Sequence, residues 1–150
     1  MRYEYTNGFD PVFIQLCHEL DAFLNDLVGG EEKRLQYIPH NRLEEIHNAI
    51  VAYYEDTPVA CASFKHYDNE TAEVKRVFIK QEYRGKGISK KMMELLEQSA
   101  KAQGYKKFVL ECGEPLVAAM RLYKTIGYCI IPNYGPYRCM SDSICMGKIL

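Results

Sequence analysis

One short segment constrains the fold of this chain more than any other, namely residues 81–89, Gln-Glu-Tyr-Arg-Gly-Lys-Gly-Ile-Ser. Two glycines flank a lysine, and the helix-like segment that follows ends only at Gly104. Glycine adopts positive φ readily and lets the backbone approach a ligand closely. The N-terminus of a helix presents backbone N–H groups that bind anions. Because a strand-like run at 73–79 precedes the loop, the segment predicts a strand–turn–helix site for phosphate groups.

The spacing of the glycines separates several classes of phosphate-binding loop. A nucleotide-hydrolysing P-loop requires Gly-x-x-x-x-Gly-Lys-Ser/Thr, and the sequence contains no such run. A dinucleotide-binding loop requires Gly-x-Gly-x-x-Gly; Gly85 and Gly87 fit its first two positions, but Lys90 stands at the third. Both nucleotide classes are therefore disfavoured. An ordinary strand-to-helix turn with solvated charges stays open as an alternative when the loop is considered alone.

Basic residues gather around this loop although the chain as a whole is close to neutral. They are Lys75, Arg76, Lys80, Arg84, Lys86, Lys90 and Lys91. A solvated helix face would give a similar run of charges, but the position beside the glycine loop favours contact with the phosphates of a ligand. The net charge of −1 gives no general attraction to nucleic acid or to an anionic membrane, so neither is expected as a partner.

Length and composition indicate one domain that spans residues 1–150, and 47% hydrophobic residues are enough for a sizeable core. No apolar stretch approaches the roughly 20 residues of a membrane span, and the first residues lack an apolar signal core, so we expect a cytoplasmic protein. The six cysteines form no Cys-x-x-Cys pair and have no His-x₃₋₅-His partner. A metal site is therefore not expected, and buried packing is the expected role of these cysteines.

Hydrophobic periodicity predicts a mixed order of strands and helices. The expected strands are 2–6, 49–54, 58–66, 71–79, 108–110, 128–131 and 143–149. The expected helices run from Pro11 to Gly29, from the glycine loop to Gly104 and from Glu114 to Gly127, with a short one at 41–47. An antiparallel meander in the middle and a β-α-β step after it indicate an α+β sandwich. Its mixed, mostly antiparallel sheet should be covered by helices on both faces.

The loop and the order of elements together resemble one known family. Arg84-Gly85-Lys86-Gly87-Ile88-Ser89 resembles the acyl-CoA signature Gln/Arg-x-x-Gly-x-Gly/Ala of the GCN5-related N-acetyltransferases (GNAT family). Ser89 departs from the usual Gly or Ala but is also small. The element order resembles that of the family over nearly the whole chain. The resemblance implies acetyl-CoA as co-substrate, held by the loop residues 84–89 and by backbone groups of Val77, Phe78 and Ile79 in the preceding strand.

Two side chains match positions at which the family carries chemistry. Leu122-Tyr123-Lys124-Thr125-Ile126-Gly127-Tyr128 resembles the Leu-Tyr-x-x-x-Gly-Phe/Tyr segment, in which the tyrosine hydroxyl donates to the cofactor sulfur. A phenol with a pKa near about 10 is a suitable donor to a thiolate, although Tyr123 also fits the apolar stripe of its helix. Glu73 lies where some members of the family have a general base; pairing with Lys75 or with a cross-strand cation is the structural alternative.

The resemblance implies an N-acetyltransferase that moves an acetyl group to a primary amine by direct attack in a ternary complex. A small-molecule or amino-acid-like acceptor is the first expectation, and a protein N-terminus or lysine side chain is the second. A non-catalytic acyl-CoA-binding module and a nucleotide-binding protein are further alternatives, and the resemblance is compatible with a homodimer. Acceptor choice is expected to depend on segments 31–48, 111–116 and 132–142, where Glu44, Glu45 and Glu111 would favour a cationic acceptor unless they are surface charges.

Overall fold

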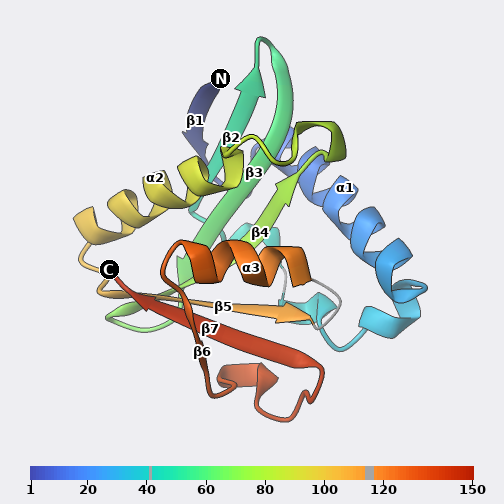
Figure 1. Ribbon diagram of the computed structural model, residues 1–150, viewed down its shortest axis with the longest axis vertical. Coiled ribbons are helices and arrows are strands. Elements are labelled where there is room, and N and C mark those ends of the chain that lie inside the picture. The colour runs from blue at the N-terminus through green and yellow to red at the C-terminus, as the bar shows by residue number, and fades with distance from the viewer. Residues whose placement is uncertain (41, 114–116) are drawn as a thin grey trace.

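The computed structural model describes residues 1–40, 42–113 and 117–150, and these form a seven-stranded sheet with helices on both faces (Figure 1). The strand order in space is β1-β2-β3-β4-β5-β7-β6. Only the neighbours β4 and β5 are parallel; every other pair is antiparallel. The strands are β1 (Arg2–Thr6), β2 (Asn48–Tyr54), β3 (Thr57–His66), β4 (Thr71–Ile79), β5 (Lys107–Gly113), β6 (Cys129–Ile131) and β7 (Ser143–Ile149).

Three α-helices cover the sheet, and the alternation of strand side chains shows which helix covers which face. Ala49 and Val51 of β2 pack in one apolar cluster with α1 (Pro11–Val28). Ile50 and Ala52 of the same strand pack in the other cluster, with α2 (Ile88–Ala102) and with Tyr123 of α3 (Val117–Thr125). Successive side chains of a strand point to opposite faces, so α1 lies on one face and α2 and α3 on the other. The predicted α+β sandwich is confirmed.

The first helix begins and ends where the sequence predicts. The Asp10 side chain accepts a hydrogen bond of 2.9 Å from the backbone N–H of Val12, as an N-cap residue does. Gly29 closes the helix at φ 91°, in the left-handed region that glycine tolerates best. Strands β1, β2, β3, β4 and β7 lie within one residue of their predicted ranges.

The segment between α1 and β2 differs from its prediction. In place of a short helix at 41–47 it contains three 3₁₀ helices, η1 (Glu31–Arg34), η2 (Ile38–His40) and η3 (Leu43–Glu45). Single 3₁₀ turns carry too little periodicity for the sequence to reveal them. Residue 41 and the predicted helix start at Glu114 lie outside the described residues. Two further 3₁₀ helices, η4 (Gln81–Tyr83) and η5 (Gly135–Tyr137), follow β4 and β6. No helix in the described part of the chain is long and apolar enough to span a membrane.

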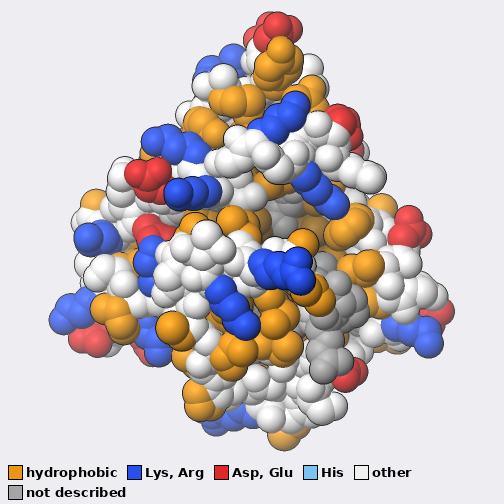
Figure 2. All heavy atoms as spheres, viewed as in Figure 1, with side chains coloured by type: hydrophobic (Ala, Val, Ile, Leu, Met, Phe, Trp, Pro, Cys, Tyr) orange, Lys and Arg blue, Asp and Glu red, His pale blue; other side chains and the backbone are white. Residues whose placement is uncertain are grey.

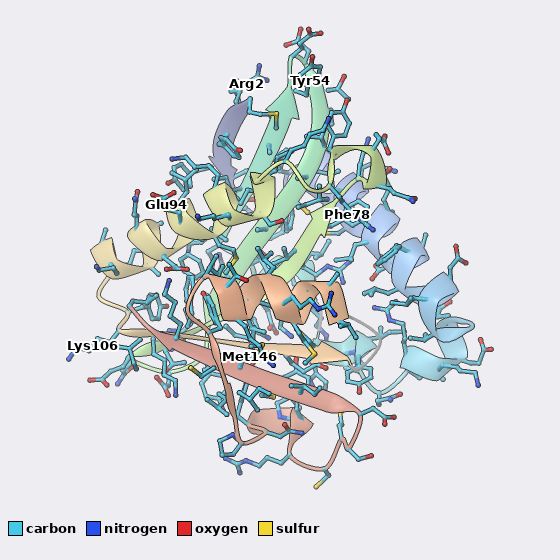
Figure 3. All side chains as sticks on the ribbon, in the orientation of Figure 1. Arg2, Tyr54, Phe78, Glu94, Lys106 and Met146 are labelled. Atoms are coloured by element: carbon cyan, nitrogen blue, oxygen red, sulfur yellow. The ribbon has the colours of Figure 1, made fainter. Side chains whose placement is uncertain are left out.

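Strands β4 and β5 pair over only three residues and then diverge, as the directions of their arrows show in Figure 1. Thr71–Glu73 pairs with Lys107–Val109, whereas both strands continue well beyond these residues. On the other side of β4, the register with β3 shifts between Cys61 and Ser63. The divergence opens the sheet at the carboxyl ends of its two parallel strands. Phe78, labelled in Figure 3, marks this end of β4.

Candidate active site

A cleft of about 710 Å³ occupies the gap between the diverging strands. Its walls come from β4, β5, α3, the second half of α1 and the glycine loop. Figure 2 shows a hollow on this face, with hydrophobic side chains inside and Lys and Arg side chains around its rim. The cleft therefore connects the predicted phosphate-binding loop at one end with the segment after α1 at the other.

The glycine loop has the conformation that its sequence predicts. Gly85 and Gly87 have φ values of 76° and 80°, and a Cβ on either would meet no atom within 4 Å. Space is therefore open at both glycines, and both line the cleft. Among the described residues no side chain caps α2 at Gly87, so the N–H groups of the first helical turn are left for an anion. This geometry suits a diphosphate that approaches the backbone closely.

Only part of the predicted basic cluster faces the cleft from the loop. Arg84 and Lys90 line it, and the Arg84 guanidinium is braced 4.7 Å above the Phe23 ring of α1. Lys86 lies over the ring of Tyr83 instead.

Other members of the cluster are engaged with the protein. Lys80 pairs with Glu19 of α1, and Lys91 pairs with Glu94 along α2. Arg121 of α3 also lines the cleft, on the opposite wall, and this contribution was not predicted from the sequence. In the sequence, its position two residues before Tyr123 was the available indication that Arg121 contributes to the site. The proximity of α3 to the loop is seen only in the fold.

The last residues of β4 present one strand edge to the cleft. Val77, Phe78 and Ile79 all line it, and β5 pairs with β4 only as far as Glu73. Backbone N–H and C=O groups on an unpaired strand edge can pair with an extended ligand, and of these the Ile79 carbonyl accepts a hydrogen bond of 3.0 Å from Arg84 Nε. Ile88, by contrast, is buried in the core beneath the loop, so that only its backbone can contribute to a site.

Tyr123 lies on α3 with its ring buried and on the wall of the cleft. The ring packs edge-on against Tyr128 at 5.6 Å between centroids, which explains the apolar position in the helix pattern. Among the described residues none forms a hydrogen bond with its hydroxyl. Burial, and next the neighbouring Cys112, raise the pKa of Tyr123. The phenol is therefore held protonated, as a hydrogen-bond donor must be.

Glu73 is buried, with 4% of its surface exposed, and does not belong to the described lining of the cleft. Its Oε2 accepts a hydrogen bond of 2.6 Å from the Tyr134 hydroxyl. Its Oε1 lies 3.6 Å from Lys75 Nζ and 4.0 Å from Lys65 Nζ. The carboxylate thus anchors a polar network behind the cleft, and the pairing with Lys75 that the sequence left open is present. Its role as a base stays a prediction.

Glu111 of β5 does line the cleft, two residues beyond the last β4–β5 pair. Burial raises the pKa of this carboxyl, while a hydrogen bond with Ser143 and the charge of Lys75 act in the opposite direction. Ser143 in turn contacts the Tyr37 hydroxyl at 3.0 Å. Glu111 is thus a carboxyl held in place at the cleft with a pKa shifted toward that of a useful base. Glu44 and Glu45 are exposed and outside the described lining.

Two buried arginines lie at the end of the cleft near α1. Arg76 is in β4 and Arg34 in η1; both have 7% of their surface exposed and both line the cleft. The two guanidiniums share the carboxylate of Asp21, at 3.0 Å from Arg76 and 3.5 Å from Arg34. Arg76 has φ 57°, a strained conformation for a side-chain-bearing residue, and such strain gathers at functional sites.

Cys112 is buried and also lines the cleft. Burial raises the pKa of its thiol to about 12, so the thiolate that a nucleophile requires is scarce at neutral pH. The packing role expected for this cysteine agrees with its surroundings. Nothing in the geometry calls for a covalent intermediate on the protein.

Comparisons with known proteins agree on one family. The Acetyltransferase (GNAT) family matches residues 14–128. An IAA acetyltransferase from Azospirillum brasilense is 32% identical over 126 residues, which cover 83% of this chain and 81% of that protein. Among solved structures, a Klebsiella pneumoniae protein assigned as an acyl-CoA N-acyltransferase is 25% identical and superimposes with a TM-score of 0.81 over 99% of this chain and 97% of its own. The PaiA N-acetyltransferase of Thermoplasma acidophilum, solved in complex with coenzyme A, is 21% identical with a TM-score of 0.74 over 100% of both chains.

Proposed function

Since the chain belongs to the Acetyltransferase (GNAT) family, we propose that it transfers the acetyl group of acetyl-CoA to the primary amine of a small, amino-acid-like acceptor. Acetyl transfer from acetyl-CoA is the activity common to the family; the small-molecule acceptor and the roles of individual residues are the proposal. The observation that carries it is the continuous cleft that joins the glycine loop, the free edge of β4 and the Tyr123 side chain.

The described residues fit acetyl-CoA along the length of this cleft. The open backbone at Gly85 and Gly87 and the uncapped start of α2 would hold the diphosphate, with Arg84, Lys90 and Arg121 adding positive charge. The free edge of β4 at 77–79 would pair with the amide groups of the pantetheine arm. The solved complex of the Thermoplasma relative with coenzyme A supports this cofactor for the same fold.

Acetyl-CoA supplies the thioester carbon that the amine nitrogen attacks, and the protein has to manage two protons. Free amines titrate well above neutral pH, so a base must remove a proton from the acceptor. Glu111 suits this task better than Glu73, because it faces the cleft whereas Glu73 is enclosed by Tyr134 and Lys75. Tyr123 would donate its proton to the departing sulfur as the carbon–sulfur bond breaks. Lys75 and Glu73 would act indirectly by fixing the charge around Glu111.

The shape of the acceptor end supports a small acceptor. Arg34 and Tyr37 reach the cleft from the segment between α1 and β2, and the Tyr37 hydroxyl is tied to Ser143 of β7. This contact ties the segment after α1 to β7 beside the cleft, and such a link would restrict a polypeptide acceptor, which needs an open groove, more than a small molecule. A protein N-terminus or a lysine side chain is the second candidate for this reason.

The test is a steady-state assay of thiol release from acetyl-CoA with a panel of free amino acids and small amines, and with peptides as the alternative. Mass spectrometry of the acceptor must show the added acetyl group. We expect turnover with members of the small-amine panel and intact protein mass unchanged by acetyl-CoA alone. Turnover with peptides only would contradict the small-acceptor proposal, and binding of acetyl-CoA without turnover of any amine would identify a non-catalytic module.

A further inference from the structure

Two buried arginines line the acceptor end of the cleft, and from them we infer that the acceptor bears a carboxylate bound by Arg76 and Arg34, as in an α-amino acid with an apolar side chain. This inference rests on the proposed function, since it concerns the acceptor of that reaction. It adds a named binding site and a chemical class to the statement that the acceptor is an amine.

The two guanidiniums are unequally satisfied by the protein. Arg34 donates to the Asn25 side chain at 2.7 Å and lies 3.5 Å from Asp21. Arg76 donates to the backbone carbonyl of Cys17 at 2.7 Å and pairs with Asp21 at 3.0 Å. Its Nε is buried and has no hydrogen-bond partner among the described residues. A buried donor without a partner is costly, and the Cys17 side chain beside this guanidinium is a weak acceptor, so the described residues satisfy Arg76 incompletely.

Charge in this part of the cleft points the same way. Two cations share the carboxylate of Asp21, and Glu111 lies near Arg34 but is the carboxyl that suits the ammonium group, so a carboxylate of the acceptor would pair with the arginines. Asp21 is itself partly exposed to solvent, with 43% of its side chain accessible. A guanidinium removed from water and incompletely paired destabilises the protein unless an anion completes the pair. The planar fork of arginine matches a carboxylate particularly well.

The surroundings supply places for the other two parts of an amino acid. Glu111 lies on the same cleft, close enough to Arg34 for that cation to lower its pKa, and it suits an ammonium group. An apolar wall from α1 borders the arginines and suits a hydrocarbon side chain; it comprises Leu20, Phe23, Leu24, Leu27 and Val28. A cation–carboxyl pair beside an apolar surface matches an α-amino acid more closely than a simple alkylamine.

Paired acceptors that differ only in the carboxylate test this inference. Leucine, methionine and phenylalanine are each compared with the corresponding amide in the acetyl-CoA assay. The amide has the lower amine pKa, near that of a peptide-like α-amino group at about 7.7–8.0, so intrinsic reactivity favours the amide. A preference for the acid therefore reports binding. We expect kcat/KM to favour the acids roughly ten- to hundredfold, as a charged hydrogen-bonded pair would give.

Variants of the two arginines test whether these residues cause the preference for the acid over the amide. Arg34→Met should reduce the ratio of kcat/KM for the acid to kcat/KM for the amide about tenfold, whereas loss of a merely structural residue would lower both values together and leave the ratio unchanged. Arg76→Lys is the second variant, because Arg76→Met removes the bonds that hold β4 to α1 and so endangers folding. Arg42→Gln is the control, since Arg42 is exposed on the same segment and lies outside the described lining.

Two results would overturn the carboxylate site. In the first, the unaltered protein acetylates the amides as efficiently as the acids. In the second, the preference for the acid survives both Arg34→Met and Arg76→Lys. Acetylation confined to amines without a carboxylate would do the same while the proposed acetyltransferase function stands. Failure of the proposed function has a different outcome: a folded protein that does not bind acetyl-CoA in calorimetry, or that acetylates no amine at all.

Discussion

Replacement of Gly87 by alanine should weaken acetyl-CoA binding far more than it weakens the fold. Gly87 has φ 80°, and a residue with a Cβ costs about 1–2 kcal/mol in the left-handed region. A Cβ at this position would meet no protein atom within 4 Å, so no steric clash adds to that cost. For a domain of this size the melting temperature should fall by roughly 2–4 °C per kcal/mol. The added methyl group would instead occupy the open space assigned to the diphosphate, and we expect affinity to fall about tenfold or more.

Gly104 provides a matched control at the other end of α2. Its φ is 96°, and a Cβ there would also meet no atom within 4 Å. Gly104→Ala should therefore lose a similar amount of stability in thermal melts followed by circular dichroism, while isothermal titration calorimetry shows unchanged affinity for acetyl-CoA. Unchanged affinity for acetyl-CoA in Gly87→Ala would refute the assignment of the loop as the diphosphate site. A Gly104→Ala loss as large as that of Gly87→Ala would show that the effect comes from the helix as a whole.

Three further predictions concern the remaining wall of the cleft. Tyr123→Phe should lower kcat by about 10²–10⁴-fold, as loss of a general acid does, with calorimetric affinity for acetyl-CoA retained; an unchanged kcat would leave Tyr123 a packing residue. Burial raises the pKa of Glu111 above its ordinary 4.5, and a base acts only when ionised, so kcat/KM should fall as pH drops through that raised pKa. Glu111→Gln should abolish this acid limb of the pH–rate profile, whereas Glu73→Gln should keep it. The reverse result would identify Glu73 as the base. Arg121→Gln should weaken acetyl-CoA binding in calorimetry, with a smaller dependence of Kd on salt, whereas Lys124→Gln on the same helix should not.

The features predicted from sequence are those that depend on local chemistry. Asp10-Pro11 at the start of α1 and Gly29 at its end determine that helix whatever it packs against. Gly85 and Gly87 likewise determine the shape of the loop, because positive φ is accessible to glycine at little cost. Tyr123 was singled out by the sequence motif around it. Its ring occupies an apolar position of α3 and also lies on the wall of the cleft, so the two expectations for this residue are compatible.

The features that sequence missed depend on contacts between distant segments. Arg76 and Lys75 appeared to belong with the loop because they are near it in sequence, yet in the fold they contact α1 and Tyr137 respectively. The divergence of β4 from β5 is what gives Glu111 access to the cleft, while Glu73 lies at the last paired position and is enclosed. No residue pattern encodes where a parallel pair separates. The sequence selected Glu73 as the base and that role stays a prediction, while access to the cleft is the reason for which we propose Glu111.

Calorimetric titration of the purified protein with acetyl-CoA, with ATP and NAD as controls, tests whether the cleft with its glycine loop is an acetyl-CoA site. We expect saturable binding of one acetyl-CoA per chain and no comparable binding of ATP or NAD, because the loop lacks the residues that both nucleotide classes require. A folded protein that fails to bind acetyl-CoA, or that binds ATP or NAD equally well, would contradict the account, and the glycine loop would then be no more than a turn between β4 and α2.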